Sequence, residues 1–139
     1  MQRYRSRVSG PLLDRIDIHI EVPPVPHSIL NQPLDPQTST SAEIRERVVL
    51  AREIQLARDG KPAHQLSSKE IEKICVLDSA ANTLLERAAT RLGLSARAYH
   101  RVLKVARTIA DLDSAAKIEE AHVCEAVSYR MLDRMSSDR

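Results

Sequence analysis

A proline-rich stretch divides the chain and constrains its fold more than any other feature. Residues 23–39, PPVPHSILNQPLDPQTS, contain five prolines, and proline lacks the amide donor that helices and central strands need. We interpret residues 23–40 as an extended linker. The linker separates an N-terminal segment, residues 1–22, from a longer region, residues 41–134, that must hold the core. Residues 135–139 form a short tail.

The segment before the linker has the pattern of a single β-strand. In IDIHIEV, residues 16–22, Ile and Val alternate with polar residues, which is typical of a half-buried strand. One strand cannot satisfy its own edge groups, and no second strand pattern follows. We therefore expect residues 1–22 to be the tail of a larger upstream domain, disordered when that domain is absent. The alternative is that two copies of the chain pair through this strand.

Beyond the linker, apolar residues recur at helical spacing between capping signals. The predicted helices cover residues 42–60 after Ser41, 69–77 with a capping box of Ser67 and Glu70, 79–93 between Asp78 and Gly93, 96–112 after Ser95, and 119–134. With three Tyr and no Phe or Trp, the core must consist of Leu, Ile, Val and Ala, which suits packed helices. The sequence therefore predicts a small all-α bundle of four or five helices, preceded by the linker and one orphan strand.

The chain lacks the common signatures of an independent enzyme. It contains neither GxxxxGK[ST] nor GxGxxG, the loops that cradle nucleotide phosphates, and its five His show no metal-ligand spacing. Cys75 and Cys124 form no CxxC pair, so we interpret both as reduced core residues of a cytoplasmic protein. With no long apolar span, we expect no membrane association, no metal site and no activity of this chain alone.

The predicted helix 96–112 carries a cationic stripe. At about 100° per residue, Arg101 and Lys104 lie within ~40° of Arg97 on one face. The opposite face is apolar and should pack into the core; it comprises Tyr99, Val102, Ala106, Ile109 and Ala110. Arg107 flanks the stripe, and with no acid between Ser95 and Ala110 we expect no partner for these cations within the helix. The stripe is either a solvated face or a site for a polyanion such as a triphosphate or a DNA backbone.

Three longer motifs resemble a known family. They are YRSRVSGPLLDRIDIHIEVP at 4–23, LSARAYHRVLKVARTIADL at 94–112 and HVCEAVSYRMLDR at 122–134, and they resemble the C-terminal part of the magnesium-chelatase-like AAA+ ATPases of the ComM (YifB) type. The resemblance implies that residues 41–134 are the helical lid domain and that the Walker A and Walker B motifs lie upstream. It further implies a hexameric ring that binds ATP and Mg²⁺. The turn DLDSAAKI at 111–118 departs from the family because it lacks a glycine often found there.

The resemblance also implies roles for individual residues. Arg15, in GPLLDR before the predicted strand, takes the place of an arginine finger that reaches the nucleotide of a neighbouring subunit. The sensor-2 arginine, which contacts the γ-phosphate from near the start of a lid helix, is Arg97 by motif position, followed by Arg101 and Lys104. From the residues alone, Arg15 could equally form a surface ion pair with Asp14 or Asp17.

By the same resemblance, the complete protein would couple ATP hydrolysis to DNA remodelling, as a helicase or branch-migration motor in recombination and natural transformation. One alternative is the motor subunit of a magnesium chelatase, acting on a protein partner. Another is a stand-alone helical nucleic-acid-binding module that uses RYRSR at 3–7 together with the cationic stripe.

Overall fold

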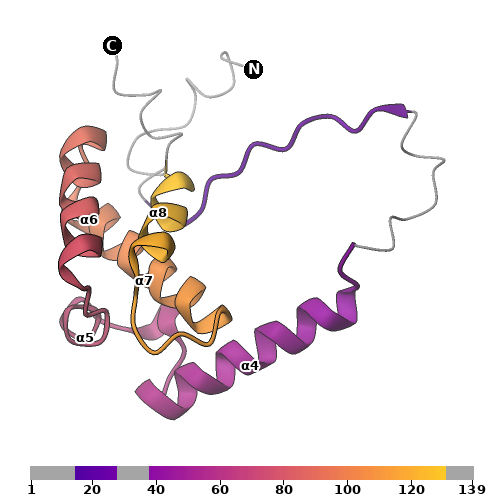
Figure 1. Cartoon of the computed structure of the whole chain (residues 1–139), viewed down its shortest axis with the longest axis horizontal. Coiled ribbons are helices and arrows are strands. Elements are labelled where there is room, and N and C mark those ends of the chain that lie inside the picture. The colour runs from indigo at the N-terminus through magenta and orange to yellow at the C-terminus, as the bar shows by residue number, and fades with distance from the viewer. Residues whose placement is uncertain (1–14, 28–37, 131–139) are drawn as a thin grey trace.

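The computed structural model describes residues 15–27 and 38–130, which form a helical bundle with an extended N-terminal segment (Figure 1). The helices are α4 (Ser41–Asp59), the 3-10 helix η1 (Ala63–Gln65), α5 (Ser68–Ile74), α6 (Ser79–Leu92), α7 (Ala96–Leu112) and α8 (Glu120–Ser128). The described residues contain no β-strand, and their one isolated bridge joins Leu77 to Ile118. The prediction of an all-α bundle is confirmed.

Local capping explains why most helix boundaries were predictable. Ser67 and Glu70 form the expected capping box of α5, with the Ser67 amide donating to Glu70 Oε2 at 2.8 Å. Asp78 caps α6 by accepting from the Ala81 amide at 2.7 Å, and Gly93 ends that helix at φ 63°. At such a positive φ a glycine is the residue of lowest strain.

Three helix ends differ from the sequence prediction. α5 ends at Ile74 rather than at the predicted residue 77. Thr40, rather than Ser41, caps α4, because Thr40 and Glu43 bond reciprocally: the Thr40 amide donates to Glu43 Oε2 at 2.6 Å and the Glu43 amide to Thr40 Oγ1 at 3.3 Å. α8 ends at Ser128, before the predicted residue 134. Residues 131–139 lie outside the described residues, as do residues 1–14 and 28–37 with the RYRSR motif and much of the linker.

α7 is the central helix of the bundle. It packs against α4, α5 and α8, and α6 packs against α8. Its predicted apolar face is confirmed: Val102, Ala106, Ile109 and Ala110 are buried, and Tyr99 packs partly buried against them. Full burial of each larger apolar side chain contributes about 1.5–3 kcal/mol, so this face holds the opposite, cationic face in a fixed orientation.

The prediction that both cysteines lie in the core is half correct. Cys75 is buried at the end of α5, and burial raises the pKa of its thiol to about 11. Cys124 is exposed on α8, so the prediction is wrong for that residue. Both thiols are free.

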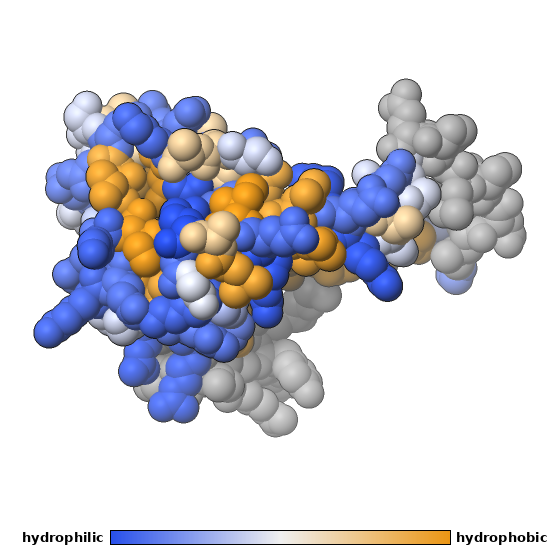
Figure 2. Space-filling view, turned by 90° about the horizontal axis from the view of Figure 1, so that it is seen from below, coloured by the Kyte–Doolittle hydropathy of each residue, from blue (hydrophilic) through white to orange (hydrophobic). Residues whose placement is uncertain are grey.

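The first half of α4 projects from the bundle (Figure 1). The helical spacing predicts one buried face of Ile44, Val48, Ala51 and Ile54, but only Ala51 and Gln55 are buried. Ile44 and Val48 are 49% and 53% exposed. Figure 2 shows the molecule from below, with apolar surface exposed among hydrophilic side chains. α4 is thus anchored through its second half.

A buried charge network forms that anchor. Asp111 of α7, 1% exposed, accepts from Arg58 Nη1 at 2.6 Å and from Arg107 Nε at 3.0 Å. Arg58 also pairs with Asp59 at 2.8 Å, and the carboxylates of Asp59 and then Asp111 raise the pKa of Arg58 above its usual range. The expectation that Arg107 has no partner in its helix is wrong, because Asp111 lies one turn further along α7.

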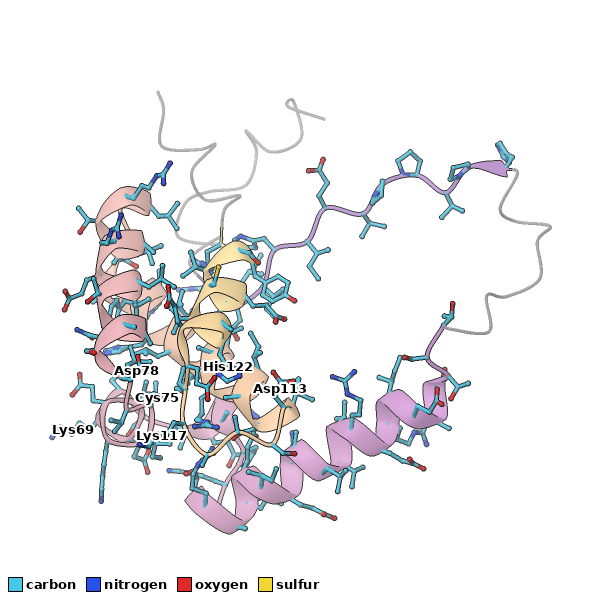
Figure 3. The ribbon with its side chains drawn as sticks, in the orientation of Figure 1. Lys69, Cys75, Asp78, Asp113, Lys117 and His122 are labelled. Carbon is cyan, nitrogen blue, oxygen red and sulfur yellow. The ribbon has the colours of Figure 1, made fainter. Side chains whose placement is uncertain are left out.

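The same network fixes the turn after α7. The Arg107 guanidinium donates to the carbonyl oxygens of Ala115 at 2.6 Å and Ala116 at 3.2 Å. Across the turn, His122 Nε2 lies 3.4 Å from Asp113 Oδ2, and the two residues face each other in Figure 3. Ser114 adopts φ 55° at the tip, a left-handed conformation that strains a residue with a Cβ atom.

Residues 15–22, the described part of the segment before the linker, are extended and pair with no strand among the described residues. They leave the bundle beside α8 (Figure 1). The His19 amide donates to the Tyr129 carbonyl at 3.0 Å, and the Arg130 guanidinium donates to the Ile16 carbonyl. The alternating apolar side chains stay 40–74% exposed, from Ile16 to Val22. The alternating pattern correctly indicated an extended conformation. The described residues contain no sheet with which this segment could pair as a strand.

Candidate phosphate-binding groove

An open groove of about 500 Å³ lies beside the first half of α7. α7 forms one wall, η1 and the start of α5 form the other, and Asp17 of the extended segment also lines the groove. Buried Leu66 and Ile71 contribute an apolar part of its lining. The remaining lining residues are His64, Ser68, Ala96, Arg97, His100, Arg101 and Lys104. The volume falls within the range of about 300–1,000 Å³ found for small-ligand sites.

The three residues predicted as sensor-2 candidates all line this groove. Arg97 is exposed and forms no ion pair with any described residue. Arg101 is half-buried and pairs with Asp17, and Lys104 Nζ lies 3.5 Å from the His64 carbonyl oxygen. Arg97 is therefore the most available of the three cations for binding an anion, because the described residues offer it no ion-pair partner. Its role as the sensor stays a prediction.

The groove contains two functional candidates that the sequence pattern did not reveal. His100 lines it one residue before Arg101, with Nε2 3.4 Å from Glu72 Oε1 of α5. Its spacing of three residues from Arg97 was the available signal, since residues i and i+3 share a helix face. Asp17 lies 84 residues before Arg101 in the chain, and no local pattern could pair them.

Arg15 lies on the segment that carries Asp17 but does not line the groove. Its side chain is exposed. Asp17 pairs with Arg101 rather than with Arg15, and Asp14, the other partner considered, lies outside the described residues. The structure does not bring Arg15 together with the sensor candidates, and its role as a finger in trans stays a prediction.

The charge balance of the groove favours an anion. Of the residues that the structure describes, three cationic side chains and one carboxylate line it, and the buried face of α7 holds the cations in place. Guanidinium groups bind phosphate oxygens through paired hydrogen bonds, and an ammonium adds a point charge. Residues 15–27 and 38–130 contain no group of three or more His, Cys, Asp or Glu able to hold a metal ion. No helix within the same residues is both long and apolar enough to cross a membrane.

Comparison with known proteins assigns the family. The model described as magnesium chelatase, subunit ChlI C-terminal, matches residues 38–130, and the model described as magnesium chelatase, subunit ChlI, matches residues 1–30. The chain therefore belongs to the magnesium chelatase ChlI C-terminal family. The break between the two matches falls in the predicted linker.

Individual relatives agree with this assignment. The chain is 49% identical to competence protein ComM of Haemophilus influenzae over 135 residues, 97% of this chain and 26% of that protein. It is 47% identical to YifB of Escherichia coli over 133 residues, 96% of this chain and 26% of YifB. It is 31% identical to the Mycobacterium bovis protein Mb2921c over 133 residues, 93% of this chain. The resemblance to the ComM and YifB type is confirmed, and the chain spans about a quarter of the length of these relatives.

Proposed function

We propose that this chain forms the lid region of a ring-forming AAA+ ATPase and that its groove contacts the γ-phosphate of ATP. The observation that carries the proposal is the convergence of Arg97, Arg101 and Lys104 on one groove. Cations fixed in advance around a phosphoryl group can stabilise the charge that develops on it during hydrolysis. Movement of the lid with nucleotide state would then drive work on a substrate.

The extended segment also supports an origin in an AAA+ ATPase. Residues 1–30 match the ChlI family model, and the apolar side chains from Ile16 to Val22 are exposed as if a sheet were to cover them. Arg15 at the start of this segment would reach the nucleotide of a neighbouring subunit, which ties catalysis to assembly of a hexamer. ATP and Mg²⁺ would be held by an ATPase domain outside this chain, with the groove supplying cations to the triphosphate.

The names of the relatives support two substrates for such a motor. ComM of Haemophilus influenzae is named a competence protein, which favours DNA remodelling by helicase or branch-migration activity during recombination and transformation. The family description names magnesium chelatase, which favours a motor that acts on a protein partner inserting metal into a tetrapyrrole. The 49% identity to ComM over 97% of this chain leads us to prefer DNA.

ATP turnover tests the proposed roles in a protein that carries this chain together with its ATPase domain. Arg97→Ala and Arg15→Ala should each lower turnover by at least ~10-fold, the low end for loss of a group that stabilises developing charge. Arg87→Ala is the matched control, since Arg87 is exposed on α6 and lies outside the groove. Unchanged turnover in both test variants would contradict the assigned roles.

A binding assay separates the remaining functions. Retention of the ATPase on DNA, and not on a chelatase partner subunit, supports the remodelling function, and the reverse supports a chelatase motor. Micromolar binding of duplex DNA by the 139-residue chain alone, falling steeply with salt, would instead favour the nucleic-acid-binding module.

A further inference from the structure

Among the described residues, Asp17 is the one carboxylate that lines the groove, and the main chain holds it there. On one side of Asp17, the Ile16 carbonyl accepts from the fully buried Arg130. On the other side, the His19 amide donates to the Tyr129 carbonyl at 3.0 Å. These two contacts fix the backbone against the end of α8, and between them the Asp17 side chain pairs with Arg101 of α7.

A carboxylate in this position competes with a phosphate for the same cation. The planar guanidinium group of an arginine binds either anion through the same pair of N–H donors. The Asp17 and Arg101 side chains are 55% and 25% exposed, and ion pairs open to water are weak. A polyphosphate carries several negative charges and reaches Arg97 and Lys104 as well, so it can displace Asp17 from Arg101.

We infer that Asp17 is a built-in competitor at the phosphate groove, and that phosphate binding releases it. This inference rests on the proposed function, because it requires that the groove binds phosphate. Displacement removes the contact between Asp17 and Arg101 and weakens the hold of the two main-chain contacts at Ile16 and His19. Arg15 lies two residues before Asp17, so occupancy of the groove controls how firmly the segment carrying Arg15 is held.

Titration of the 139-residue chain with inorganic tripolyphosphate at fixed ionic strength, followed by calorimetry, tests the competition. Asp17→Asn keeps the shape and removes the charge, and it should tighten binding by about 2- to 5-fold, the range for loss of an exposed ion pair. Glu21→Gln is the matched control. It removes one charge from the same segment outside the groove, and it should change affinity by less than about 1.5-fold. In an Arg101→Ala background, Asp17→Asn should have no effect.

Hydrogen exchange of the His19 amide provides a readout that does not depend on affinity. In the wild-type chain, saturation with tripolyphosphate should accelerate exchange at this amide, because the segment is held less firmly. Equal affinities of the Asp17→Asn and Glu21→Gln variants, with unchanged exchange, would overturn the competition and leave the phosphate site intact. Failure of the wild-type and Asp17→Asn chains to bind tripolyphosphate would overturn the phosphate site and the competition together.

Discussion

Replacement of Asp111 by Asn tests whether the buried charge network anchors α4 and the turn after α7. The Asp111 side chain is fully buried and accepts hydrogen bonds from Arg58 at 2.6 and 3.2 Å and from Arg107 at 3.0 Å. Asparagine keeps the shape but removes the negative charge. Arg58 would keep Asp59 as a partner, whereas Arg107, 2% exposed, would keep only neutral carbonyl acceptors.

The expected loss of unfolding free energy depends on this difference between Arg58 and Arg107. Breaking a buried ion pair costs about 3–5 kcal/mol when a charge is left uncompensated. Since only one of the two guanidinium groups loses its counter-charge, we expect about 3 kcal/mol, the low end of that range. For a domain of this size, such a loss lowers the melting temperature by roughly 12–24 °C.

Urea and thermal unfolding followed by circular dichroism measure this cost. Asp113→Asn is the matched control, because Asp113 lies two residues further on, is 57% exposed and faces His122 at 3.4 Å; it should cost less than about 1 kcal/mol. If Asp111→Asn loses no more than about 1 kcal/mol beyond the control, the network contributes no more than a surface ion pair and does not anchor α4.

Three further predictions concern single side chains. At pH 8 an alkylating reagent should modify exposed Cys124 rapidly and leave Cys75 unmodified, because Cys75 is buried with a thiol pKa of about 11; a Cys124→Ser chain that still reacts rapidly would contradict this. Ser114→Gly should raise the unfolding free energy by about 0.5–1 kcal/mol, since relief of the strain at φ 55° exceeds the entropy cost of glycine, and equal or lower stability in urea would count against it. Lys61 and Ser67 lower the pKa of Glu70 to about 2, so Glu70 stabilises the fold above its unfolded pKa of 4.5 and loses this effect as the pH falls towards 2. The stability gap between the wild-type chain and Glu70→Gln should therefore close between these pH values, and a gap that persists at pH 2 would argue against the assignment.

The sequence predicted the elements whose causes are local. Caps such as Asp78, Ser95 and Gly93 act within four residues of their partners, so these helix ends could be read directly. The cationic stripe on α7 followed from helical periodicity in the same way. The stripe alone could not predict the groove beside it, because η1 and α5 form the facing wall.

The failures have physical causes that lie beyond local pattern. α4 has an apolar stripe along its length, yet only its second half reaches α7, so Ile44 and Val48 stay half exposed. The pattern predicts that Arg107 flanks the stripe with no partner in its own helix, but Asp111 one turn away and Arg58 from α4 make it part of a buried network. Asp17 and Arg101 are 84 residues apart in the sequence, so only the folded structure shows that they pair.

Mapping phosphate contacts on the 139-residue chain shows whether the groove beside α7 binds phosphate. In a titration with tripolyphosphate followed by nuclear magnetic resonance, we expect the largest shifts at the polar residues of α7 that line the groove, Arg97, His100, Arg101 and Lys104. Largest shifts at the exposed arginines of α4, such as Arg45 and Arg52, or no shifts at any residue, would contradict this expectation.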